Sequence, residues 1–325
     1  MAEGQGRVRP SQGERDHRQH HHGLEAGRRW LMIQFIQNLI LGLLLGGVYA
    51  LVAGGLTLIF GVMRVINIAH GAFLILAAFL TYTLWNGLGI DPLLASLVTT
   101  PVVGAIGWVT YKLVVAPIRT APMASTVLLT FGLALIIEAA LGTIWGNNST
   151  AIRPGYADES FTVAGLFLPK AEVYGGLVAV LVLVTLGLVL TKTWLGRAIR
   201  AAAINPAGAE LVGIKVAAVA ALVFALGIAA AGAGGAIVGV LYPFVAGAHY
   251  QWIARLLAIV VLGGMGSVNG AILAAVMFGV AETLTAAYVS PSWATAVPYA
   301  IVFAVLLIRP QGLLGTRMRE DAVPA

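Results

Sequence analysis

The chain has 325 residues, of which 59% are hydrophobic and 10% charged, whereas soluble domains carry roughly 25% charged residues. A soluble fold of this length could not bury so much apolar surface, so lipid must be its main solvent. The absence of cysteine excludes disulfides, thiolate metal sites and a cysteine nucleophile. The net charge of +6 comes from basic residues scattered through short connections, which indicates a membrane protein and no nucleic-acid partner.

Residues 1–31 form a polar tail that differs from the rest of the chain. Six arginines and four acidic residues stand there beside the histidine run 20–22, with almost no apolar side chains. Such a stretch buries too little to offset its chain entropy, so we predict that it is disordered. The histidines are interpreted as part of a solvated tail, with a metal site or a tag remnant as the alternative. Met32 opens the apolar region and is a candidate start of the natural protein.

Nine apolar segments follow, and most approach the roughly 20 residues that cross a hydrocarbon core. We therefore predict an all-α, polytopic integral membrane bundle over residues 32–314, with eight to ten membrane-embedded helices and nine as the best count. Residues 315–325 are predicted to be a cytoplasmic tail. The first segment would be about 42 Å long, so it must tilt, protrude or break at glycines 46–47 or 54–55. The segments are 33–60, 70–88, 92–115, 124–145, 172–191, 217–241, 252–265, 269–288 and 295–309.

Lysine and arginine in the short connections set the predicted orientation, because these residues concentrate in cytoplasmic loops. The connections at 112–124 and 192–216 and the C-terminus carry them and are predicted to be cytoplasmic. The connections at 86–92 and 242–251 have neither residue, and 146–171 is roughly charge-balanced, so these are predicted to be external. Two simple spans before residue 88 would place the N-terminus outside, against Arg28 and Arg29, and the sequence leaves that end open.

Polar groups between the first two apolar segments are candidates for lining a substrate pathway. Asn67, His70 and Gly71 stand there, directly after Arg64, and polar residues inside a membrane are costly and often functional. A short turn at the membrane interface is the alternative that the sequence leaves open.

Glycines interrupt the apolar pattern again after residue 262. Gly264, Gly266 and Ser267 are further pathway candidates, because a helix broken inside the bilayer presents amide groups to an anionic substrate. A tight turn between two helices, without a ligand, is equally compatible with the pattern. The glycine spacing does not match a dinucleotide-binding loop.

Two glutamates, Glu138 and Glu282, lie well inside apolar segments. Each is expected to face the bundle interior and to be protonated or paired with a neighbouring helix. We favour a structural hydrogen-bonding role for both, with substrate contact as the alternative that keeps Glu138 among the pathway candidates. The small-residue run 229–235 is predicted to be a close-packing face.

The connection 194–214 has the signals of two short helices folded against the membrane. Asn205 can cap a helix that begins at Pro206, and Gly213 is placed to end it. A mere connector needs no such signals, so we predict a cytoplasmic coupling helix that meets a partner protein. The residues assigned to coupling are Arg197, Arg200, Asn205, Glu210 and Gly213.

Six stretches, at residues 42–51, 67–71, 196–201, 209–214, 263–271 and 309–313, stand in a recognisable order and spacing. Together they resemble the permease subunits of branched-chain amino acid ABC importers, in the class that pairs with a second, similar permease. The resemblance extends from about residue 32 to about residue 314. It implies a pathway formed by two permeases, two ATPase subunits on the cytoplasmic side and a periplasmic or extracellular solute-binding protein, in the cell inner membrane.

The same resemblance implies a transport subunit that binds no cofactor, because ATP is used by the partner subunits. No phosphate-binding GxxxxGK[ST] loop occurs in the chain, in agreement with that expectation. The cargo is expected to be a branched-chain or related amino acid, with an amide or urea as another possibility. A self-contained secondary transporter or channel is the competing hypothesis, and a membrane enzyme is disfavoured because no catalytic cluster is recognisable.

Overall fold

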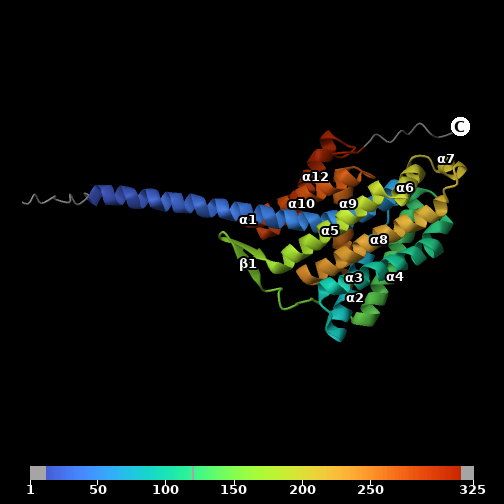
Figure 1. Cartoon of the computed structure of the whole chain (residues 1–325), viewed down its shortest axis with the longest axis horizontal. Coiled ribbons are helices and arrows are strands. Elements are labelled where there is room, and N and C mark those ends of the chain that lie inside the picture. The colour runs from blue at the N-terminus through green and yellow to red at the C-terminus, as the bar shows by residue number, and fades with distance from the viewer. Residues whose placement is uncertain (1–11, 119–120, 316–325) are drawn as a thin grey trace, which may run out of the picture.

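The computed structural model describes residues 12–118 and 121–315, with side chains described from Arg29 onward (Figure 1). Within these residues the structure consists of helices and one short hairpin. The elements are α1 (Gln12–Met63), α2 (His70–Leu88), α3 (Pro92–Thr110), the π-helix η1 (Tyr111–Val115), the 3-10 helix η2 (Ala116–Ile118), α4 (Met123–Trp145), β1 (Ser160–Val163), β2 (Leu166–Pro169), α5 (Lys170–Lys192), α6 (Trp194–Ile204), α7 (Pro206–Leu211), α8 (Val216–Leu241), the 3-10 helix η3 (Ala246–Ala248), α9 (His249–Gly263), α10 (Val268–Tyr288), α11 (Pro291–Ala294) and α12 (Ala296–Ile308).

Nine helical stretches in the described part of the chain are long and apolar enough to cross a membrane. They coincide with the nine predicted segments, so the all-α bundle and its best helix count are confirmed. Three of these stretches are composite, because α3 continues through η1 and η2, η3 precedes α9, and α11 adjoins α12. An odd number of spans leaves the two ends of the bundle domain on opposite faces of a membrane.

The two faces of the bundle can be distinguished by what gathers at each. Helices α6 and α7 lie at one face (Figure 1). We call it the basic end because the stretch from the end of α5 to the start of α8 carries Lys192, Arg197, Arg200 and Lys215. The antiparallel hairpin of β1 and β2 lies at the opposite end, where the Phe167 amide donates a hydrogen bond to Gln37 Oε1 at 2.9 Å. Helix α1 therefore enters the bundle at the hairpin end and finishes at the basic end.

Helices α1, α8 and α10 pack closely because glycine and alanine line their contacts. A Cβ atom added at Gly55 would lie 2.5 Å from the Gly227 carbonyl oxygen, and one at Gly46 would lie 2.7 Å from Val276 Cα. One glycine of each pair in α1 thus serves close helix contact, and α1 does not break at either pair. The run 229–235 of α8 is almost entirely buried, as predicted for a close-packing face.

The connection between α1 and α2 runs back into the bundle. His70 Nε2, at the start of α2, lies 3.1 Å from the carbonyl oxygen of Val52. Val52 is eleven residues before the end of α1, or about 16 Å along the helix axis. Residues 64–69 therefore return to mid-depth in non-helical form, where Thr130 of α4 accepts a hydrogen bond from the Ile68 amide at 3.2 Å.

Helix α1 also continues outward, and Figure 1 shows its first part projecting beyond the bundle. From Gln12 onward the structure has helix where the sequence predicted a disordered tail. Extending an existing helix adds a hydrogen bond per residue without a new nucleation step, which composition alone does not capture. Residues 1–11, and 316–325 of the predicted C-terminal tail, lie outside the described residues.

Candidate functional site

Two helices begin side by side at mid-depth and run in opposite directions. A Cβ added at Gly71, the second residue of α2, would lie 2.7 Å from the carbonyl oxygen of His249, the first residue of α9. From this point α2 runs towards the hairpin end, whereas α9 runs to the basic end. Neither helix start has a side-chain cap. Two helix N-termini thus bring partial positive charge to the middle of the bundle.

The carboxylate of Glu138 lies at this junction. Its Oε2 is 3.0 Å from His249 Nε2, and the Tyr250 hydroxyl also hydrogen-bonds to it. His249 is fully buried, whereas the Glu138 side chain is 29% exposed. The carboxylate therefore sits at the start of α9 with one side open to the surroundings of the bundle.

That open side distinguishes α4 from the other peripheral helices. The most apolar windows of α4, α5 and α11–α12 are each only 17% buried, so these three spans form much of the outer surface. In their central turns, α5 and α12 expose apolar side chains and threonine, whereas α4 adds a partly exposed carboxylate. A carboxylate facing hydrocarbon costs several kcal/mol, so this side of α4 is suited to protein or water.

The other residues predicted around the first interruption lie deeper. Asn67 and His70 are fully buried beneath the start of α2, and Gly71 forms the close contact with α9. The structure therefore brings Gly71, His249 and Glu138 into one continuous set of contacts. The sequence assigned no role to His249, because its pairing with Glu138 joins two residues 111 positions apart.

Gly264, Gly266 and Ser267 lie elsewhere, in the turn from α9 to α10 at the basic end. Both glycines have positive φ angles, 97° and 87°, and Ser267 Oγ caps α10 by accepting from the Gly270 amide at 3.2 Å. The Leu313 amide donates to the Leu262 carbonyl oxygen at 2.7 Å and covers the end of α9. This is the geometry of a tight inter-helix turn, and it is remote from Glu138.

Glu282 belongs to a second polar cluster, whose other members the sequence did not identify. Its carboxylate lies 3.0 Å from Arg255 Nη2 and accepts a hydrogen bond from the Tyr49 hydroxyl at 2.8 Å. The Glu282 and Arg255 side chains are each 16% exposed. A single arginine inside the predicted segment 252–265 was the signal for this pairing, because a cation there needs a buried anion.

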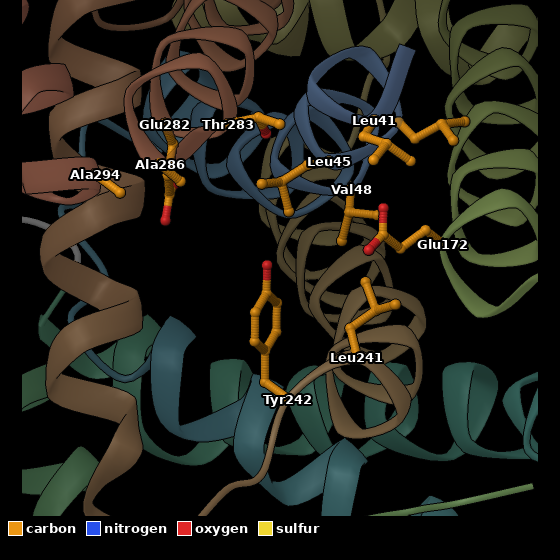
Figure 2. Close-up of a pocket in the computed structure, with 11 residues that line it drawn as sticks. Leu41, Leu45, Val48, Glu172, Leu241, Tyr242, Glu282, Thr283, Ala286 and Ala294 are labelled. Carbon is orange, nitrogen blue, oxygen red and sulfur yellow. The ribbon is translucent and has the colours of Figure 1, made fainter. Parts of the chain in front are cut away.

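A cavity of about 260 Å³ adjoins this cluster on the hairpin side. Figure 2 shows the carboxylates of Glu172 and Glu282 and the hydroxyl of Tyr242 directed towards a common space. Burial raises the pKa of Tyr242 to about 12, so its phenol is protonated at neutral pH and can donate a hydrogen bond there. The remaining lining residues are Leu41, Leu44, Leu45, Val48, Leu241, Thr283, Ala286 and Ala294.

Helices α6 and α7 form as the sequence predicted. Asn205 Oδ1 accepts a hydrogen bond from the Gly208 amide at 2.9 Å, and Pro206 is the first residue of α7. Gly213 has a φ of 83°, a left-handed conformation that glycine adopts without strain. The chain then turns into α8.

Helix α6 is attached to the end of α5, whereas an apolar surface is exposed at the ends of α6 and α7. Arg200 donates a hydrogen bond to the Leu190 carbonyl oxygen, and a side chain at Gly196 would collide with the same carbonyl. The apolar surface consists of Ile204, Leu211 and Val212, of which Leu211 is 90% exposed. Arg197 and Glu210 are also exposed, and Glu210 directly precedes Leu211 in the chain.

Among the described residues, no group of three or more histidine, aspartate or glutamate side chains gathers as metal ligands would. The conspicuous features are thus a polar junction at mid-depth, an acidic cavity and an apolar surface at the ends of α6 and α7. None of them has the arrangement of a nucleophile, a base and an orienting group that would indicate catalysis.

Comparison with known proteins gives a consistent result. Residues 38–306 match the family model described as the permease component of branched-chain amino acid transport systems. The chain is 29% identical over 301 residues to the high-affinity branched-chain amino acid transport system permease protein LivH of Escherichia coli and of Salmonella typhimurium, covering 87% of this chain and 96% of each relative. It is 29% identical over 297 residues to BraD of Pseudomonas aeruginosa, covering 86% of this chain and 96% of the relative. No solved structure matches the chain.

Proposed function

Because the chain belongs to the family of permease components of branched-chain amino acid transport systems, we propose that it is the membrane-spanning subunit of an ATP-driven importer for branched-chain or related amino acids. As a member of this family it is a multi-pass membrane protein and a transport subunit without a catalytic site. The proposed partners are a second permease, two ATPase subunits and a solute-binding protein on the outside. The named relatives support this cargo, since each is a branched-chain amino acid permease.

The proposed pathway runs along the side of α4 and α9 that carries Glu138. A partly exposed carboxylate at mid-depth is the single observation that carries this assignment, because lipid would be a poor neighbour for it. We propose that the second permease covers this side and that the amino acid passes between the two subunits. An α-ammonium group has the charge to contact Glu138 during passage.

The proposed coupling surface consists of Ile204, Leu211 and Val212 at the basic end, which is then the cytoplasmic face. Large apolar side chains outside the bundle are suited to a groove on another protein. Because α6 is attached to the end of α5 through Leu190, a displacement of the docked α7 would pass into the transmembrane bundle. This arrangement supports a mechanical link to an ATPase.

Replacement of the most exposed member tests the link. Leu211→Glu removes apolar docking area without disturbing the bundle, so we expect co-expressed ATPase subunits to separate from the permease during purification. ATP-dependent leucine uptake should fall about tenfold, equivalent to ~1.4 kcal/mol of docking energy. Leu314→Glu, at another exposed leucine of the basic end, is the control and should retain both properties. Normal ATPase association and uptake in Leu211→Glu would contradict the coupling assignment.

One observation favours the competing function, a self-contained ion-driven transporter. Glu172 and Glu282 line the same cavity, and neighbouring carboxylates can bind a proton or a cation. Reconstitution of the chain alone distinguishes the two functions. Leucine uptake driven by a proton or sodium gradient without ATPase subunits would favour the competing function, whereas a strict need for ATPase subunits and ATP supports the importer.

A further inference from the structure

A groove of about 420 Å³ lies at the basic end between α1, α5 and α10, and residues of α6 line its mouth. The floor is formed by α1, and the walls by α5 on one side and α10 on the other. It is separate from the cavity near Glu282 and from the polar junction at Glu138. The residues that the argument uses are Gly54, Leu58, Gly187, Leu190, Arg200 and Ile272.

Two glycines in the groove are not explained by helix packing. A Cβ added at Gly187 would meet nothing within 4 Å, and one at Gly54 would meet only Leu183 Cδ2 at 3.7 Å. Gly55, one position later, is different, because a Cβ there would collide with α8. Gly54 and Gly187 therefore widen the groove, whereas Gly55 permits helix contact.

The groove has the depth and lining of a site for one lipid chain. Gly54 lies nine residues before the end of α1, or about 14 Å along its axis. This is about half of a ~30 Å hydrocarbon core, the extent of one leaflet. Leu58, Leu190 and Ile272 contribute apolar walls along that length. An acyl chain lying there would replace contacts that the glycines leave unfilled.

The mouth of the groove is cationic. Arg200 lines it, held in place by the hydrogen bond that it donates to the Leu190 carbonyl oxygen. None of the ion pairs within 4.0 Å in the described part of the chain involves Arg200. Lys192, the last residue of α5, is also exposed and lies two positions after Leu190. The charge is therefore suited to an anionic group at the membrane surface.

We propose that this groove binds one anionic phospholipid, with an acyl chain between α1 and α5 and the phosphate headgroup at Arg200. The lipid would contact α6 and α1 at once, so it would support the attachment of the coupling segment to the bundle. Binding depends on the groove alone and does not require the proposed transport function.

The test measures lipid binding to the purified full chain by native mass spectrometry. We expect dioleoylphosphatidylglycerol to remain bound at energies that strip dioleoylphosphatidylcholine. Arg200→Gln should weaken phosphatidylglycerol binding about fivefold, the effect of one basic residue near a lipid headgroup. Gly187→Leu should fill the groove and remove this bound lipid.

Matched variants control for charge and volume. Arg197→Gln removes an exposed arginine of the same helix, and Gly132→Leu enlarges an α4 glycine that also has no atom within 4 Å of its added Cβ. Both should retain phosphatidylglycerol binding. Unchanged lipid binding in Gly187→Leu, or equal binding of the two lipids, would overturn the proposal. If inorganic phosphate bound equally strongly and depended on Arg200, the mouth would be a site for a soluble anion. If Gly187→Leu lost a co-purified permease while lipid binding was unchanged, the groove would be a site for a partner helix.

Discussion

Two carboxylates inside the bundle, Glu138 and Glu282, are both paired with basic side chains of α9, yet their surroundings differ. Glu282 meets Arg255 and Tyr49 between α1, α9 and α10, and both charged partners are largely buried. Glu138 meets His249 from the peripheral helix α4, and its side chain is 29% exposed. Arginine is always charged, so Arg255 is a permanent cation inside the bundle.

The difference separates a pair that fixes the structure from a carboxylate available to another molecule. Glu282 is needed to compensate a permanent buried charge, so its removal acts on stability. Glu138 lies on a peripheral helix, and one side of its carboxylate is open. The comparison therefore assigns Glu282 to helix packing and leaves Glu138 as the candidate contact for a substrate or a second subunit.

The largest effect is expected from Glu282→Gln. The substitution leaves the Arg255 charge without its partner, which typically costs about 3–5 kcal/mol of stability. We expect a large fall in the thermal unfolding temperature of the detergent-purified protein. Glu159→Gln is the control, because its pair with Lys170 is at the surface and is worth less than about 1 kcal/mol. If Glu282→Gln were as stable as Glu159→Gln, Glu282 would not be a counter-charge that fixes the structure.

A second pair of variants tests which peripheral side faces lipid. Leu181→Arg places a charge in the middle of α5, where lipid is expected and insertion should cost about 3 kcal/mol. Leu135→Arg places the same charge on α4 beside Glu138. Both leucines are exposed, 66% and 41% respectively. We expect Leu181→Arg to lower the amount of protein in the membrane, and Leu135→Arg to insert normally but to abolish leucine uptake.

The difference between the α4 side and the α5 side would be contradicted if Leu135→Arg inserted as poorly as Leu181→Arg. In that case the side of α4 near Glu138 would also face hydrocarbon, and the pathway would have to be sought elsewhere. Immunoblots of membrane fractions measure insertion, and uptake is normalised to the amount of inserted protein.

A smaller effect is expected from Glu138→Gln. His249 keeps a hydrogen-bonding partner, so the thermal unfolding temperature should stay close to that of the unmodified chain. Leucine uptake by the proposed importer should fall about tenfold, as expected from the loss of one charged hydrogen bond of ~1.5 kcal/mol. Full uptake by Glu138→Gln would exclude this residue from the pathway. Glu282→Gln serves as the comparison variant, because its defect is expected in the thermal unfolding temperature.

Much of the fold could be predicted because lipid imposes a local rule on sequence. Each span must carry about 20 apolar residues, so all nine could be located from composition along the chain. Asn205, Pro206 and Gly213 likewise predicted the helix pair at the basic end, because caps and left-handed residues act within a few positions.

The candidate site depended on contacts that no local pattern encodes. Glu138 is paired with His249 and Glu282 with Tyr49, at separations of 111 and 233 positions. The sequence placed polar residues correctly inside apolar segments but could not say which helix would supply a partner. The sequence also could not show that Gly264 lies in the turn from α9 to α10, whereas Gly71 lies in a helix contact at mid-depth.

The amino-acid sequence by itself determined that the chain crosses the membrane, where its spans lie and which connection carries the paired short helices, because hydropathy and capping are properties of neighbouring residues. Only the tertiary structure decided that α2 and α9 begin together at mid-depth and that α4 carries the open carboxylate. Those features arise from how helices distant in sequence pack on one another. Glycine contacts such as Gly55 with Gly227 set that packing and take effect only once both helices are in place.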